Sequence, residues 1–71
     1  MATKVASDVS GSVWKLIAKP GDAIEAEAEI AIIESMKMEI PVLAPRAGTL
    51  ARFFVEEGEA VSEGQPIAEL D

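Results

Sequence analysis

The sequence predicts an all-β fold, a flattened β-barrel or sandwich of two small antiparallel sheets related by a pseudo-twofold internal repeat. The chain aligns with itself without a gap when residues 1–34 are laid over residues 38–71. Both copies contain segments rich in β-branched and aromatic residues, and each segment leads to a glycine turn. Prolines interrupt the second copy and exclude a long helix there.

The repeat is carried by residues in a fixed register. Many aligned pairs conserve their chemical character, and six pairs are identical between Val5 and Glu34. Similar composition alone could make two glycine-punctuated β segments look alike, but it would not place both glycines in the same register. The identical pairs are Val5/Val42, Gly11/Gly48, Gly21/Gly58, Ala23/Ala60, Ile30/Ile67 and Ala31/Ala68.

Each half predicts a strand, a glycine turn and a second strand. The strands at residues 11–17 and 48–55 lead to turns at residues 20–22 and 57–59. Two hairpin-like units are therefore expected, and they should pack face to face because neither can bury its apolar face alone. Three prolines cannot donate to a ladder and are expected at strand ends or edges, namely Pro41, Pro45 and Pro66.

Residues 22–39 also fit a helix, because an Asp-x-x-Glu capping box opens the segment and good helix formers follow it. The repeat argues against this alternative. The partners of Glu27 and Glu29 are Gly64 and Pro66, which would break a helix in the second copy. The segment is therefore expected to be a turn followed by a strand.

The seam between the copies, residues 35–37, is expected at one end of the molecule. Residues 30–34 end the first half and residues 38–42 begin the second, so a hairpin there would place Lys37 in solvent. The seam lacks the Gly, Asn or Asp that tight hairpins recruit, and such local disagreements tend to mark functional sites.

A straight strand is the alternative for the seam. Met36, Met38, Ile40 and Val42 alternate with polar residues and proline, as in one half-buried strand in which Lys37 is an ordinary exposed lysine. Methionines at a protruding tip would instead expose apolar surface, which makes sense if another protein contacts them.

Composition excludes several classes of function. The 71 residues make one small domain, and the chain has no Cys and no His, so it has no thiolate, imidazole base or common soft metal site. The net charge of −7 disfavours nucleic acid and anionic membranes as partners. No apolar run approaches the roughly 20 residues that span a bilayer, and no signal or transit segment is apparent. A soluble, cytoplasmic protein is expected, with an organelle matrix not excluded.

The motif Glu-Ser-Met-Lys-Met-Glu-Ile-Pro-Val at residues 34–42 resembles the signature of the biotinyl domain of the biotin carboxyl carrier protein family. The likeness extends through residues 44–48 and 57–61 and covers about residues 3–70 as a single domain. The family carries Met-Lys-Met on a hairpin between two quasi-symmetric halves. Ser35 replaces a more frequent Ala, and related lipoyl domains typically carry Asp-Lys-Ala, so the methionines favour biotin over lipoate. The ungapped repeat leaves no room for the thumb insertion of some members.

The resemblance implies a non-catalytic carrier whose Lys37 is covalently biotinylated by biotin protein ligase. The carrier would shuttle carboxybiotin between biotin carboxylase and carboxyltransferase, with both partners outside this domain. It further implies that ligase and carboxylase read the residues around the lysine, and that four glycines are structural turn residues. The recognition residues are Glu34, Ser35, Met36 and Met38, and the glycines are Gly11, Gly21, Gly48 and Gly58.

Two alternatives stay open, a lipoyl or dual biotin/lipoyl attachment protein and an unmodified interaction module of the same fold. Trp14 is expected in core or edge packing. Ordinary surface lysines are expected at Lys4, Lys15 and Lys19, and a solvated acidic face is expected from Glu25, Glu27 and Glu29.

Overall fold

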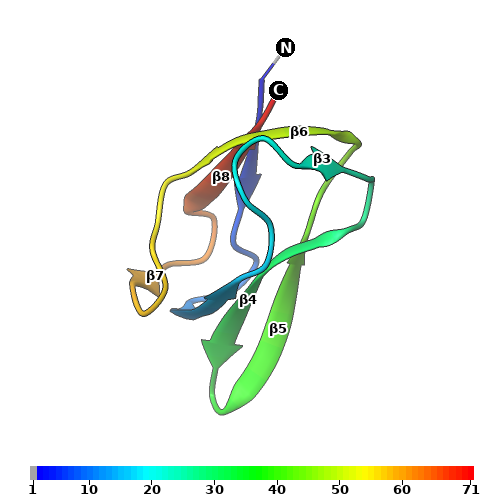
Figure 1. The fold of residues 1–71 in the computed structure, drawn as a ribbon. Helices are drawn as coiled ribbons and strands as arrows, with labels where there is room; N and C mark the ends of the chain where they lie inside the picture. The colour runs from blue at the N-terminus through cyan, green and yellow to red at the C-terminus, as the bar shows by residue number, and fades with distance from the viewer. Residues whose placement is uncertain (1) are drawn as a thin grey trace.

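A computed structural model describes residues 2–71 and shows, across that range, eight strands and no helix (Figure 1). The all-β expectation is confirmed. The strands are β1 (Thr3–Ala6), β2 (Gly11–Leu16), β3 (Ala23–Ile24), β4 (Glu29–Ser35), β5 (Met38–Leu43), β6 (Gly48–Phe53), β7 (Ala60–Val61) and β8 (Pro66–Leu70). No part of the described chain forms a helix that is long and apolar enough to cross a bilayer.

The strands form two four-stranded antiparallel sheets that draw on both halves of the chain. One sheet has the order β1-β8-β6-β3, and the other, called here the hairpin sheet, has the order β5-β4-β2-β7. The expectation of two separate hairpin-like halves packed face to face is therefore wrong in detail. The glycine turn after β2 carries the chain across to the opposite sheet, where β3 pairs with β6.

The repeat is visible in the strands themselves. Strands β6, β7 and β8 begin 37 positions after β2, β3 and β4, and the order of one sheet becomes the order of the other under this shift. The buried residues follow the same rule, since each has a buried counterpart 37 positions away. The pairs are Val5/Val42, Ser7/Ala44, Val13/Leu50, Ala18/Val55, Ile24/Val61, Ile30/Ile67, Ala31/Ala68 and Ile33/Leu70.

Bulges repeat with the same spacing and explain how adjacent residues can both face the core. In β4 the pairing with β5 shifts between Glu29 and Ala31, so Ile30 is an extra residue and is fully buried beside Ala31. In β8 the pairing with β1 passes over Ile67 in the same way. A regular strand would turn one residue of each adjacent pair toward solvent.

The segment that also fitted a helix contains β3, a turn and β4. Glu27 has a left-handed φ of 67°, and its repeat partner Gly64 has a φ of 84°. Both turns need this conformation, which glycine adopts freely and glutamate does not. Shared geometry thus overrides the helix propensity of residues 22–39.

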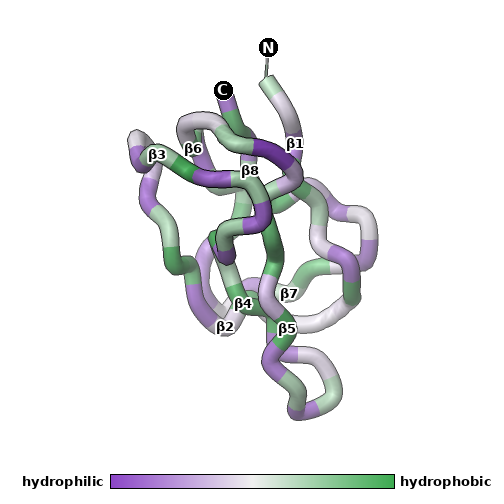
Figure 2. The backbone as a smooth tube through the Cα atoms, turned by 90° about the vertical axis from the view of Figure 1, so that its right-hand side faces the viewer, coloured by the Kyte–Doolittle hydropathy of each residue, from purple (hydrophilic) through white to green (hydrophobic). Residues whose placement is uncertain are grey.

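The molecule is elongated, with extents of 33 × 16 × 16 Å, and the β4–β5 hairpin projects from one end. The start of β1 and the end of β8 lie at the opposite end in Figure 1, and Figure 2 shows the hairpin extending beyond the rest of the tube. Pro41 lies in the edge strand β5 and Pro66 opens β8, as expected for residues that cannot donate to a ladder.

Candidate functional site

The projecting hairpin ends in a two-residue turn. Ser35 and Met38 are the last paired residues of β4 and β5, and Met36 and Lys37 join them. Met36 has a φ of 52° and Lys37 a φ of 66°. Two consecutive positive values are those of a type I′ turn, which matches the twist of the flanking strands. The straight-strand alternative is therefore excluded.

The turn is strained because neither central residue is one that favours this conformation. Left-handed geometry costs a non-glycine L-residue about 1–2 kcal/mol. Asn-Gly would make the same turn without most of that cost. The structure therefore holds Met36 and Lys37 in a conformation that their own side chains disfavour.

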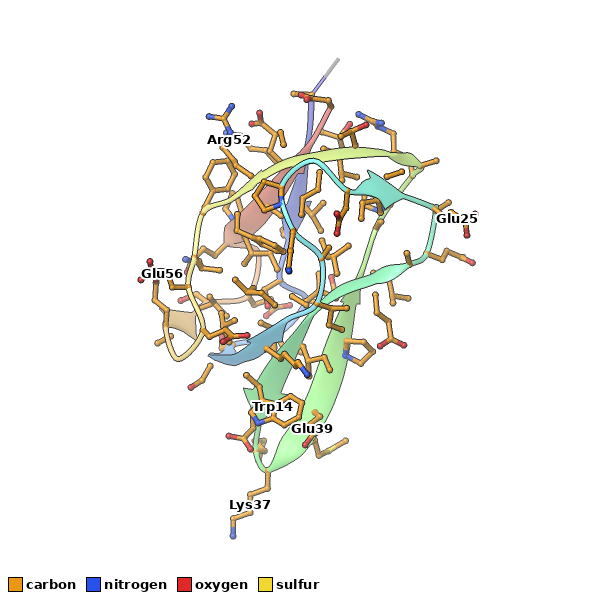
Figure 3. The ribbon with its side chains drawn as sticks, in the orientation of Figure 1. Trp14, Glu25, Lys37, Glu39, Arg52 and Glu56 are labelled. Carbon is orange, nitrogen blue, oxygen red and sulfur yellow. The ribbon has the colours of Figure 1, made fainter. Side chains whose placement is uncertain are left out.

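The side chains of the turn point into solvent. The side chain of Met36 is 93% exposed and that of Met38 is 63% exposed, although both are apolar. Lys37 is exposed, and Figure 3 shows its side chain extending away from the domain at the very tip of the hairpin. The primary amine is thus the most projecting chemical group at this end of the molecule.

Ser35 anchors the base of the turn. Its side chain is partly buried, and its hydroxyl donates a hydrogen bond of 2.8 Å to the backbone carbonyl of Ser10. The hydroxyl of Ser10 in turn accepts a bond of 3.0 Å from the backbone N–H of Glu63. The hairpin is therefore tied to two loops at its root, and Ser35 contacts its own protein at the position where it was expected to serve recognition.

Gly11 allows the start of β2 to approach the end of β4. A Cβ atom on Gly11 would collide with the backbone carbonyl oxygen of Glu34. The symmetry-related Gly48 lies in the same way against the backbone carbonyl of Asp71, whose oxygen would be 2.7 Å from a Cβ atom at this position. Both glycines open strands, so their expected assignment as turn residues is wrong, and close backbone contact is the reason for glycine. Two others lie in turns with positive φ, Gly21 at 94° and Gly58 at 90°.

Two carboxylates face each other directly below the turn. Glu34 and Glu39 are cross-strand partners, and both are exposed. The ion pair in the described part of the chain, Arg52 with Glu69 at 3.9 Å, lies on the other sheet. Like charges directly opposite on a sheet destabilise it. The Glu34–Glu39 pair, like the strained turn above it, does not contribute to folding stability.

This arrangement presents a primary amine in solvent. Over residues 2–71 there is no enclosed cavity and no group of three or more potential metal ligands. The structure places one lysine at an exposed tip. Such a group suits covalent modification inside the active site of another protein.

Trp14 was expected in the core or in edge packing, and the structure corrects this. It lies in β2, an interior strand of the hairpin sheet, and 48% of its surface is exposed. It is the extra residue of a bulge, because β2 pairs with β4 through Val13 and then Lys15. Adjacent residues of a strand point to opposite faces, so an inward-facing Val13 would have predicted an outward-facing Trp14.

Comparison with known proteins gives consistent results. The family model described as "Biotin-requiring enzyme" matches residues 1–70. The chain is 46% identical over 66 residues to the biotin/lipoyl attachment protein of Bacillus subtilis, covering 93% of this chain and 90% of that one. It is 38% identical over 68 residues to the biotinylated protein TB7.3 homolog of Mycobacterium leprae, covering 96% of each.

Larger proteins contain the same unit as a small part. The acetyltransferase component of the pyruvate dehydrogenase complex of Azotobacter vinelandii, a dihydrolipoyllysine-residue enzyme, is 38% identical over 86% of this chain and 10% of its own length. The crystal structure of Kluyveromyces lactis urea carboxylase superposes with a TM-score of 0.95 at 32% identity, covering all of this chain and 6% of that one.

Proposed function

The chain belongs to the biotin/lipoyl attachment family, and from this premise we propose that Lys37 carries the prosthetic group and that the group is biotin. The observation that carries the proposal is the strained two-residue turn, which presents the lysine amine outward between two exposed methionines. An exposed primary amine is the functional group that accepts an acyl chain. No other described lysine lies in a comparable turn.

The modification is an acyl transfer to nitrogen. The amine of Lys37 attacks the acyl carbon of biotinyl-adenylate, an amide C–N bond forms, the bond from the acyl carbon to the phosphate oxygen breaks, and AMP and a proton leave. Only the neutral amine has a lone pair with which to attack, so deprotonation is a task of the ligase active site. The reaction converts a cation into a neutral amide and takes the formal net charge of the chain from −7 to −8.

We propose a carrier role, with no catalysis by the domain itself. Once attached, biotin supplies a ureido nitrogen that accepts a carboxyl group from one enzyme and gives it up in another. The rigid hairpin fixes the start of the arm, and the tether keeps the group at high effective concentration near both active sites. The proposed partners are a biotin protein ligase, a biotin carboxylase and a carboxyltransferase, in a cytoplasmic setting.

Lipoate is the second candidate. Dihydrolipoyllysine-residue enzymes are among the relatives, and they share the attachment unit. Met36 and Met38 distinguish the present tip from the Asp-Lys-Ala that lipoyl domains typically carry. The methionines therefore favour biotin.

The proposal is tested by incubating the purified, unmodified chain with a biotin protein ligase, ATP and biotin, and mapping the adduct by peptide mass spectrometry. The expected result is one biotin per chain, on the peptide that contains Lys37. Lys37→Arg keeps the charge and should remain unmodified. An adduct that persists in Lys37→Arg would contradict the site assignment.

A parallel reaction with a lipoate ligase and lipoate decides between the two groups, because the adducts differ in mass. Faster and complete loading with lipoate, with little loading by biotin, would establish the lipoyl alternative. A chain that neither ligase modifies would establish an unmodified interaction module.

A further inference from the structure

The pseudo-twofold repeat allows each surface position of one sheet to be compared with the equivalent position of the other sheet. Positions 37 apart occupy equivalent places in the two sheets, so both must meet the same demands of folding. The core obeys this equivalence throughout. Where the outer faces differ in character, the fold does not require the difference.

The outer face of the hairpin sheet carries an apolar group that its counterpart lacks. Lys15, Ile32 and Pro41 form one row across β2, β4 and β5 through their register. The equivalent row of the other sheet consists of Arg52, Glu69 and Lys4. That row is fully charged and contains the Arg52–Glu69 ion pair.

Two larger apolar side chains border the hairpin-sheet row. Trp14 is 48% exposed and Leu43 is 46% exposed, whereas the equivalent residues are Ala51 and Ala6. The hairpin-sheet face is defined here as Trp14, Ile32, Pro41 and Leu43. The other sheet folds with Ala, Glu, Lys and Ala at the same places, so folding does not require an apolar surface at this position.

Acidic residues lie around this face. Glu34 and Glu39 are paired between it and the turn, and Glu29 pairs with Leu43 at its far end. Two copies docked through this face would bring these carboxylates together in a chain that already has a net charge of −7. A protein with an apolar centre and a basic border is complementary to it.

Docking on the face of the sheet is favoured over strand addition at β5, the edge strand that forms the projecting hairpin. The edge strand β5 contains Pro41, which has no N–H to donate and interrupts any new ladder. The face also lies close to the attachment point. Figure 3 shows Trp14 and Glu39 near the hairpin tip from which Lys37 extends.

An enzyme that modifies Lys37 must contact more than the turn. A specific interface usually involves about 20 residues from each partner, and Met36, Lys37 and Met38 are too few to provide it. The outer face of the same sheet, which contains Trp14, offers additional apolar surface. Exposed aromatic residues of this kind often contribute most of the binding energy at an interface.

We propose that the hairpin-sheet face is the docking surface for the biotin ligase, which contacts it through an apolar surface bordered by lysine and arginine while Lys37 enters the active site. This inference rests on the proposed function. It assigns to Trp14 a role in binding the ligase, separate from the chemistry at Lys37.

The test is the steady-state kinetics of biotinylation by a purified biotin protein ligase, with the unmodified chain as the varied substrate. Trp14→Ala should raise KM about tenfold and leave kcat nearly unchanged. Trp14→Phe should have a KM close to that of the wild type. Phe54→Ala is the matched control, because Phe54 is 44% exposed but lies in the loop after β6. It should keep the wild-type KM.

A second variant, I32E/P41K, copies the charged row of the other sheet onto the hairpin sheet. Its fold is expected to survive because the chain already tolerates that row at the equivalent place. Its KM should rise at least as much as that of Trp14→Ala. Thermal unfolding followed by circular dichroism checks that each variant is folded.

An unchanged KM for both Trp14→Ala and I32E/P41K would overturn the inference, as would an equal rise of KM in Phe54→Ala. A wild-type chain that the ligase does not modify would defeat the proposed function, and the inference would fall with it. Biotinylation of the wild type therefore tests the proposed function, and the KM values of the variants test the docking surface.

Discussion

At the scale of single residues, the hairpin tip combines features that reduce folding stability. Met36 and Lys37 hold left-handed backbone conformations, and the exposed methionines bury little apolar surface. Glu34 and Glu39 repel each other below them. The rest of the domain is stable enough to impose this geometry. The turn therefore sets the backbone position of Lys37, and the side chain extends from it into solvent.

Replacing Met36 by Asn tests the strain. Asn accepts the left-handed conformation more readily and is the favoured first residue of a type I′ turn. Met36→Asn should raise the free energy of unfolding by about 1 kcal/mol, measured by urea denaturation. Met38→Asn is the control, because Met38 lies in β5, and it should give no gain. A Met36→Asn variant no more stable than wild type would show that the turn stores no strain.

Residue types alone could identify Lys37 as the candidate, because the chain has few other reactive groups and the lysine stands at the midpoint of the repeat. They could not reveal the turn type, since Met and Lys are poor predictors of positive φ. The symmetry and the resemblance to the biotinyl domain pointed to a turn there. Trp14 was misplaced because a lone tryptophan was assumed to pack inside, although its neighbour Val13 takes the inward position.

At the scale of elements, the hairpin is held at its root by close backbone packing. Gly11 in β2 lies against the carbonyl of Glu34, and Ser35 bonds to the carbonyl of Ser10. Both contacts join β4 to the segment that begins β2. They tie the root of the projecting hairpin to the neighbouring strand of its sheet.

Gly11→Ala should therefore lower the free energy of unfolding by about 2–3 kcal/mol, because the new methyl group overlaps a backbone carbonyl that cannot easily move. Gly21→Ala is the comparison. It meets no neighbouring atom and suffers only from its φ of 94°, so it should cost about 1 kcal/mol. Chemical denaturation of both variants measures the difference, and equal losses would refute the role given to close packing at Gly11.

The strands were predictable from composition and the repeat, but their partners were not. Local patterning distinguishes buried from exposed positions and does not state which strand lies alongside. The turn after β2 was therefore predicted to be a hairpin. In the structure β3 crosses to the other sheet and pairs with β6, and β2 pairs with β4 and β7. The bulges at Ile30 and Ile67 were hidden for the same reason, since they depend on pairing.

At the scale of the whole molecule, the two halves are a single folding unit. Each sheet takes two strands from each half, and the core consists of residue pairs related by the repeat. Neither half can complete a sheet or bury its apolar residues alone. Among the described residues, the seam and the outer faces of the sheets are places where the two halves differ.

Separate peptides of residues 1–37 and 38–71 should each be unfolded, with random-coil circular dichroism and narrow amide dispersion in NMR spectra. The reason is that β2 loses its neighbour β7, and β6 loses its neighbour β3, when the other half is absent. The intact chain under the same conditions is the control. A folded peptide from either half would contradict the interdependence of the halves.

The central claim is that the hairpin presents one backbone position for loading, and exchange of two adjacent residues tests it most directly. The double variant Met36→Lys/Lys37→Met keeps the composition and charge and moves the amine by one residue within the same strained turn. Peptide mass mapping after exhaustive reaction with a biotin ligase should find biotin on Lys37 of the wild type and none on the variant. Loading of the shifted amine at the wild-type rate would contradict the claim.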